Sequence, residues 1–186
     1  MTFLVLGLVL FIGVHMVPSM GGLKGSLTGK LGATGYQGVY SLLSLAGLGL
    51  IIFGMMQAPF ENLWVPPAVG GLLCFGLMAV AVVLYVGAFM PSSIKHFTRH
   101  PMLWGTFAWA CAHLLANGDL ASLLLFAGFG AFAIAKVFLI GAGQTPELGP
   151  RQPITKDIIL LVVAGAVYGL LTYFHQYLSG EAILSA

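Results

Sequence analysis

Charged side chains are scarce in this 186-residue sequence, which has seven Lys or Arg and five Asp or Glu, 6% of the chain. Hydrophobic residues make up 59%, and the mean hydropathy is +1.02. Such a composition excludes a soluble domain with a polar surface. The chain also has no run of Lys or Arg that would attract a polyanion, which argues against nucleic-acid binding. Its only cysteines, Cys74 and Cys111, fall in apolar segments, where a thiol usually behaves as a small hydrophobic group.

The sequence contains long apolar segments in place of charge. A membrane-crossing helix needs about 20 apolar residues, so a chain of this length has room for about six. The segments fall at about 3–19, 36–57, 67–90, 101–116, 120–142 and 158–178. We therefore expect one all-α domain over residues 1–186, a polytopic helical bundle in the lipid bilayer.

The connections between these segments differ in composition. The glycine-rich stretch 21–35 and the proline-rich stretch 143–156 are expected to be loops. Asn117-Gly118-Asp119 has the composition of a tight turn, and Asp119 is placed to cap the helix that follows.

Basic residues in the connections predict the orientation, because Lys and Arg accumulate on the cytoplasmic side. Six of the seven lie after the first, third and fifth spans: Lys24, Lys30, Lys95, Arg99, Arg151 and Lys156. Both termini are then extracytoplasmic. The first span lacks the positive segment that precedes a cleaved signal sequence, so we expect it to be retained.

The seventh basic residue, Lys136, lies inside the fifth span. Its position is about six residues, or roughly 9 Å, from the cytoplasmic end. The side chain could reach back to the membrane interface. Alternatively, it could face the bundle and bind an anionic group, such as a carboxylate of a bound cofactor.

The histidines are the strongest candidates for chemistry, because such groups are costly within lipid. His96 lies in a polar loop, and His175 lies near the outer end of the last span, where an interfacial position costs little. His15 and His113 share a pattern: a glycine two turns earlier (Gly7, Gly105) and an aromatic residue one turn earlier (Phe11, Trp109). Glycine allows close approach of a backbone or a macrocycle.

The first and fourth spans run in opposite directions, and helical side chains lean toward their own N-terminus. The rings of His15 and His113 would therefore lean toward the membrane midplane and toward one another. They could be hydrogen-bonded to neighbouring helices, or they could together ligate one haem, for which histidine is a usual axial ligand.

Three stretches resemble the NnrU-like integral membrane proteins, and the resemblance covers nearly the whole chain. They are Gly13-Val14-His15-Met16-Val17-Pro18-Ser19, residues 36–45 from Tyr36-Gln37-Gly38 to Leu45, and residues 99–119 from Arg99-His100-Pro101 to Asn117-Gly118-Asp119. The resemblance implies a bacterial inner-membrane protein linked to denitrification, acting with the nitrite and nitric oxide reductases or their assembly factors. It also implies kinship with zeta-carotene isomerase, whose NnrU-like domain binds haem b.

On that relationship, His15 and His113 match the proposed haem ligands, and His100 looks like a further important histidine. Lys136 and Arg99 could then meet the haem propionates, with Trp109 and Gly105 beside the ring. Ala110 stands where the isomerase carries a cysteine that could exchange with a histidine ligand, so such an exchange is in doubt here.

A looser resemblance leads to the isoprenylcysteine carboxyl methyltransferases, through Arg99-His100-Pro101 followed by Gly105 and Asn117. There Arg99 and His100 would contact S-adenosylmethionine. Those enzymes continue with a glutamate pair after the next span, whereas here Glu147 is the only acid between Gly143 and Asp157.

Three functions remain open from the sequence: a haem-binding sensor, carrier or assembly factor, a haem-dependent isomerase-like enzyme on a lipophilic substrate, and a membrane methyltransferase. Detection of haem in the purified protein would favour either haem-dependent function over the methyltransferase. No catalytic acid, base or nucleophile is evident beyond the histidines, so the sequence does not decide whether the protein is an enzyme.

Overall fold

The computed structural model describes residues 1–143 and 147–179, and this part of the chain is all-α, as predicted. Its elements are α1 (Thr2–Met16), η1 (Val17–Ser19), α2 (Gly21–Met56), α3 (Gly70–Phe89), α4 (Ile94–Phe97), α5 (Pro101–Ala116), α6 (Leu120–Gly143) and α7 (Ile154–Ser179). Each of the six predicted apolar segments corresponds to one long helix. The last helix begins four residues before the predicted start, and residues 144–146 of the predicted loop 143–156 lie outside the described part.

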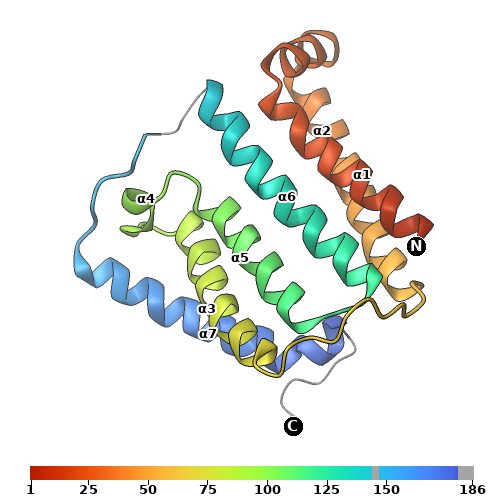
Figure 1. Ribbon diagram of the computed structural model, residues 1–186. Coiled ribbons are helices and arrows are strands. Elements are labelled where there is room, and N and C mark those ends of the chain that lie inside the picture. Colours follow the sequence, from red (N-terminus) through yellow and green to blue (C-terminus); the bar gives the residue numbers. More distant parts are fainter. Residues whose placement is uncertain (144–146, 180–186) are drawn as a thin grey trace.

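Five of the helices, α1 with η1, α2, α3, α6 and α7, are long and apolar enough to cross a membrane. The exception is α5, whose 16 residues cover about 24 Å, less than the roughly 30 Å of a bilayer core. It lies between α3 and α6 in the middle of the bundle (Figure 1). Its buried residues are small, among them Gly105, Thr106, Ala110 and Ala112, and they allow its neighbours to approach closely.

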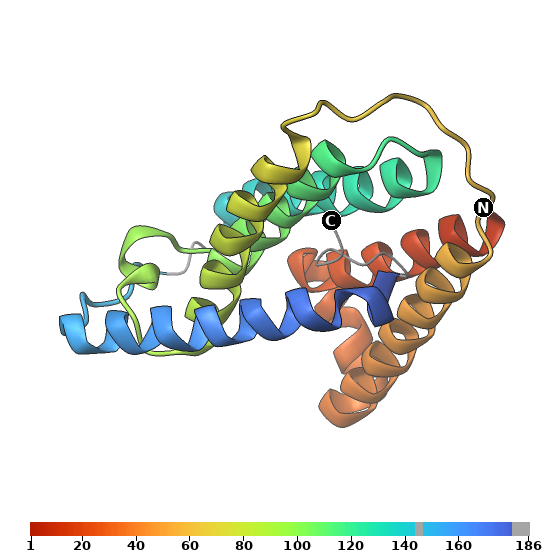
Figure 2. The same ribbon diagram turned by 90° about the horizontal axis from the view of Figure 1, so that it is seen from below.

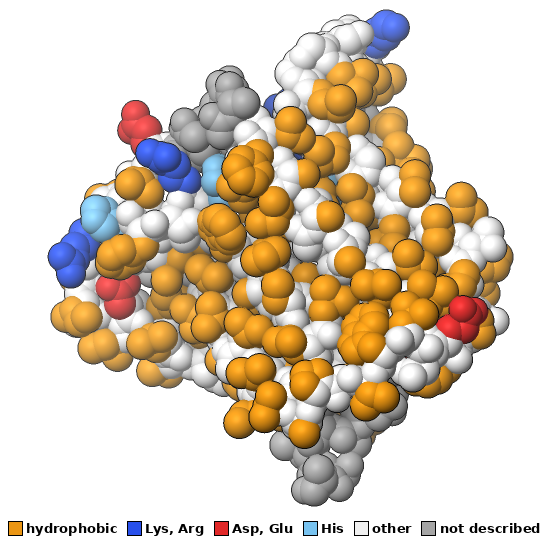
Figure 3. All heavy atoms as spheres, in the orientation of Figure 1, with side chains coloured by type: hydrophobic (Ala, Val, Ile, Leu, Met, Phe, Trp, Pro, Cys, Tyr) orange, Lys and Arg blue, Asp and Glu red, His pale blue; other side chains and the backbone are white. Residues whose placement is uncertain are grey.

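The helices follow one another across the bundle. An antiparallel hairpin of α1 and α2 forms one edge, α6 lies between this hairpin and α5, and α7 packs against α3 (Figure 1). On the face shown in Figure 3, hydrophobic side chains cover the middle, and Lys and Arg side chains lie at the rim. This arrangement suits a protein whose hydrophobic middle contacts the lipid bilayer.

Glycines bring the two helices of the hairpin into backbone contact. A Cβ added to Gly7 would lie 2.6 Å from the amide nitrogen of Ile51. One added to Gly47 would lie 2.9 Å from the amide nitrogen of Phe11, and one added to Gly54 would overlap the backbone of Leu4. In lipid, where burial of apolar surface drives helix association little, such close packing is a main source of stability.

The predicted loop at 21–35 is wrong, because this stretch is helical and forms the first part of α2. The helix is interrupted only at Gly32, where φ is 71° and ψ is 166°, a conformation available essentially to glycine alone. A glycine-rich composition favours loops in water. Near a membrane, however, a helix satisfies its own backbone hydrogen bonds, which outweighs the low helix propensity of glycine, about 1 kcal/mol per residue.

The segment that joins α2 to α3 passes outside the turn between α5 and α6 (Figure 2). The carbonyl oxygen of Gly118 accepts hydrogen bonds from the amides of Leu63 (2.8 Å) and Trp64 (3.1 Å), and the amide of Leu120 donates to the carbonyl of Glu61 (2.9 Å). A Cβ on Gly118 would overlap the carbonyl of Trp64. The turn is therefore fixed by a neighbouring segment as well as by its own sequence.

The predicted cap of α6 is confirmed: the Asp119 carboxylate accepts a hydrogen bond of 2.9 Å from the amide of Ser122. We expect Asp119→Ala to lower the free energy of unfolding by about 1 kcal/mol, because a helix-start amide loses its acceptor. Asp119→Asn keeps an acceptor oxygen and should lose less. Thermal unfolding in detergent measures both variants, and equal losses would show that the carboxylate acts through its charge alone.

Candidate histidine sites

His15 lies in the last turn of α1, where its ring is held by two contacts. Nδ1 donates a hydrogen bond of 2.7 Å to the carbonyl oxygen of Phe11, and the imidazole stacks on the Phe11 ring with centroids 4.1 Å apart. The ring of Tyr40 from α2 lies 5.4 Å away. With the proton on Nδ1, a neutral imidazole presents the lone pair of Nε2, which is the arrangement of a histidine prepared to bind a metal.

Lys136 of α6 reaches the end of α1 and donates a hydrogen bond of 2.6 Å to the carbonyl oxygen of His15. The last carbonyls of a helix have no partner within it, and a cation is favourable there because of the helix dipole. The ammonium also lies 5.5 Å from the centre of the Phe132 ring. The side chain thus faces the bundle and caps α1. Its predicted contact with an anionic ligand group stays a prediction.

His113 lies in the last turn of α5 and repeats the local geometry of His15. Nδ1 donates to the carbonyl oxygen of Trp109 at 2.9 Å, and the ring stacks on Phe126 of α6 with centroids 4.5 Å apart. The Asn117 side-chain amide donates to the carbonyl of His113 at 2.8 Å and so caps the helix end. In both predicted ligands, therefore, the ring is held in place and Nε2 is the nitrogen that its own helix does not use.

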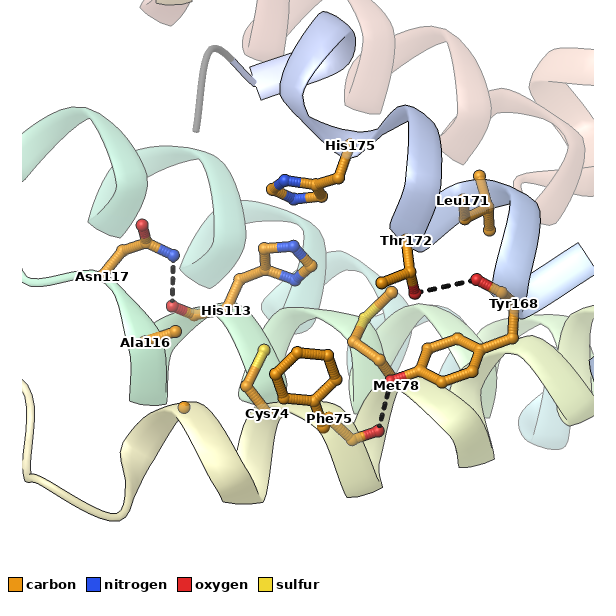
Figure 4. Close-up of a pocket in the computed structure, with 11 residues that line it drawn as sticks. Cys74, Phe75, Met78, His113, Ala116, Asn117, Tyr168, Leu171, Thr172 and His175 are labelled. Carbon is orange, nitrogen blue, oxygen red and sulfur yellow. Dashed lines mark hydrogen bonds between the residues drawn. The ribbon is translucent and has the colours of Figure 1, made fainter. Parts of the chain in front are cut away.

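A cavity of about 430 Å³ lies beside His113, between α3, α5 and α7 (Figure 4). This volume is within the range of about 300–1,000 Å³ that is usual for small-molecule sites. Its lining includes Cys74, Phe75 and Met78 from α3, His113 and Asn117 from α5, and Tyr168, Thr172 and His175 from α7. The Tyr168 hydroxyl donates to the carbonyl of Phe75 at 3.0 Å and ties α7 to α3.

His175 reaches the same cavity from α7, and Figure 4 shows its ring and the ring of His113 directed into one space. The sequence pointed only to an interfacial position for His175. Tyr168, Thr172 and His175, spaced four and three residues apart, line this cavity from one face of α7. This spacing is the sequence signal that could have placed His175 on one helix face with Tyr168 and Thr172.

The structure does not bring His15 and His113 together. Three aromatic rings link them in series: Phe11 stacks on His15, Phe129 lies 5.5 Å from Phe11 and 5.6 Å from Trp109, and Trp109 lies 5.4 Å from His113. Two ligands of one metal ion need bonds of about 2 Å each. Joint ligation by His15 and His113 thus stays a prediction that this arrangement of helices does not favour.

His100 ends the loop before α5 and is the N-terminal capping residue of that helix, whose Trp104 amide donates to the His100 carbonyl at 3.1 Å. Burial, and then the neighbouring Arg99 guanidinium, lower the pKa of the His100 imidazole. Arg99 itself is exposed. Neither residue lines the cavity beside His113.

The predicted neighbours of His113 pack within the protein. Trp109 makes edge-to-face contacts with Phe126 and Phe129 of α6, at 4.9 and 5.6 Å between centroids. Gly105 faces α3, where an added Cβ would lie 3.2 Å from the carbonyl of Ala81. Gly105 thus allows close approach of a helix backbone, which is one of the two uses expected for it, the other being close approach of a macrocycle.

His96 is exposed, as expected, and its Nδ1 lies 3.2 Å from the carbonyl oxygen of Gly149. The Gly149 amide donates to the carbonyl of Lys95, so the segment before α7 is attached to α4. Within the described residues, no group of three or more His, Cys, Asp or Glu side chains is placed to hold a metal ion.

Long apolar helices, with histidines fixed inside them, define a polytopic membrane protein with a cavity between three of its helices. The model of the family described as NnrU protein matches residues 3–182, and the chain belongs to this family. No curated protein and no solved structure shows a significant match to it.

Proposed function

We propose that this protein binds haem b in the cavity between α3, α5 and α7, with His113 as an axial ligand. The observation that carries the proposal is the His113 ring itself: Nδ1 is held by the Trp109 carbonyl, and the ring lines a cavity that another imidazole shares. Aromatic and apolar side chains, including Phe75 and Met78, surround this space and suit a flat hydrophobic ligand.

The geometry favours His175 as the second axial ligand, because it lines the same cavity from the opposite helix. The sequence pattern favours His15 instead. Its Nδ1 is held by a backbone carbonyl, as that of His113 is, but the rings of Phe11, Phe129 and Trp109 lie between the two histidines. Haem with two histidine ligands supports electron transfer or sensing, whereas a displaceable ligand would admit nitric oxide or an organic substrate.

The chain's own residues would orient the ligand and exclude water. The carbonyl of Trp109 fixes the donor tautomer of His113, and Phe126 holds the plane of its ring. Tyr168 holds α7 against α3 through the Phe75 carbonyl, which keeps the cavity walls at a fixed separation.

The NnrU family relationship supports a location in the bacterial inner membrane and a role that sustains nitrite and nitric oxide reductase activity. The distribution of basic residues supports extracytoplasmic termini. A haem-dependent reaction on a lipophilic substrate is the alternative, and the apolar wall of the cavity is the feature that favours it.

Absorption spectra of the purified protein, oxidised and reduced, test the haem proposal after expression with ample haem. We expect a low-spin spectrum that His113→Ala and His175→Ala abolish or shift and that His15→Ala and His96→Ala leave unchanged. His113→Gly with added imidazole should recover part of the spectrum, which separates loss of a ligand from misfolding.

Two results would contradict this assignment. A folded wild-type protein without haem would overturn the proposed function. Loss of the spectrum in His15→Ala but not in His175→Ala would place the second ligand on α1 and show that the helices rearrange around haem.

A further inference from the structure

The first part of α2 lies outside the bundle and points to a membrane function of its own. The whole helix has 36 residues, about 54 Å, which exceeds a bilayer core of roughly 30 Å. The part after Gly32, at about 36 Å, is sufficient to cross the bilayer. At Gly32 the backbone leaves the helical conformation, and the preceding turns bend away at the end of the hairpin (Figure 1).

The side chains of residues 21–31 are arranged around the helix in three groups. Leu23, Leu27 and Leu31, spaced four residues apart, form one apolar stripe. At 100° per residue, Lys24 and Lys30 lie about 60° on either side of the middle of this stripe. The opposite face carries glycine, with Ser26 and Thr28 at its edges.

The leucine stripe is not covered by the rest of the protein. Leu23 is 44% exposed and Leu31 is 46% exposed, and only Leu27 is half-buried. The two lysines are exposed. An apolar stripe with a lysine at each edge is the pattern of a helix that lies in the plane of a membrane surface, because lysine stems extend along the apolar region while their ammonium groups reach the headgroups.

We infer that residues 21–31 form an interfacial helix that binds anionic phospholipid headgroups on the cytoplasmic side of the membrane. The leucines would enter the boundary between headgroups and acyl chains, and the Lys24 and Lys30 ammonium groups would pair with lipid phosphates. Gly32 would make the turn from the surface into the crossing part of α2. The inference is independent of haem binding and of the histidine sites.

The position of this helix connects it to the hairpin. It follows η1, and the amide of Lys24 donates to the carbonyl of Met20 at 3.0 Å, so the helix continues almost directly from the end of α1. A membrane surface that holds residues 21–31 would therefore also hold the end of α1 at a fixed depth.

Single cysteines labelled with a fluorescent probe test the inference in the full-length protein, with Cys74 and Cys111 replaced by alanine. Leu23→Cys reports the stripe, because Leu23 is one of its two exposed leucines. Gly25→Cys is the matched control, because it lies on the opposite face and an added Cβ meets nothing within 4 Å. Each is placed in vesicles of phosphatidylcholine alone or with phosphatidylglycerol, and quenching is measured with aqueous iodide and with spin-labelled lipid.

In vesicles with phosphatidylglycerol, we expect the Leu23→Cys probe to be several-fold less accessible to iodide than the Gly25→Cys probe and to be quenched by spin-labelled lipid. Lys24→Gln combined with Lys30→Gln should remove the dependence on phosphatidylglycerol. Equal iodide access at the two positions would overturn the inference, and so would protection that is identical in both lipids. Cross-linking of Leu23→Cys between two copies would also overturn it, because a second protein would then cover the stripe.

Discussion

Gly54→Ala is expected to separate α1 from α2 and to lower the free energy of unfolding by about 3 kcal/mol, the upper part of the range for an overpacked site. The reason is steric: the new Cβ would overlap the backbone of Leu4, which is fully buried. A backbone atom cannot move aside as a flexible side chain can, so the two helices must shift. Thermal or denaturant unfolding in detergent gives the loss directly.

Gly49→Ala is the matched control for this substitution. It lies on the same helix, and an added Cβ meets nothing within 4 Å. Alanine has the higher helix propensity, so this variant should be neutral or stabilised by up to about 1 kcal/mol. Equal unfolding midpoints for the two alanine variants would mean that the hairpin does not depend on backbone contact at Gly54.

Lys136→Met is expected to lower the free energy of unfolding by about 2 kcal/mol, because a hydrogen bond from a charged group is lost and a carbonyl at the end of α1 loses its partner. The hydrogen bond of 2.6 Å to the carbonyl of His15 is the contact removed. Methionine keeps most of the stem volume, which limits the effect to the ammonium group. Unfolding midpoints and haem content are measured on the same samples.

Lys156→Met removes an exposed lysine and serves as the control, with no measurable loss expected. If Lys136→Met instead lost haem at unchanged stability, the ammonium would be a ligand contact, as the sequence allowed. If neither stability nor haem content changed, the cap on α1 would be unimportant.

The apolar segments and the Asp119 cap could be predicted because they depend on local features, a run of hydrophobic residues and an acceptor before a helix. The relative position of His15 and His113 could not be predicted from the sequence. Each lies in the last turn of its helix, and α1 and α5 run in opposite directions (Figure 1), so the two rings lie toward opposite ends of the bundle. The lean of both side chains toward the membrane midplane predicts that they meet, but the depth of each helix is set by its neighbours.

The contribution of His175 could not be predicted for a related reason. Its position near the end of an apolar span is consistent with an interfacial residue, and only the packing of α7 against α3 brings it to the cavity beside His113. The helical state of 21–35 could not be predicted from its glycine content, which favours loops in a soluble protein, whereas near a membrane a backbone that satisfies its own hydrogen bonds is favoured.

The short central helix α5 has a consequence for access to the site. A length of about 24 Å falls roughly 6 Å short of the bilayer core, so α5 does not cover the full thickness of that core. His113 lies one turn from one end of this helix. The shortfall would bring water and headgroups closer to the cavity than the membrane thickness suggests, so that the ligand proposed above would keep its polar edge hydrated.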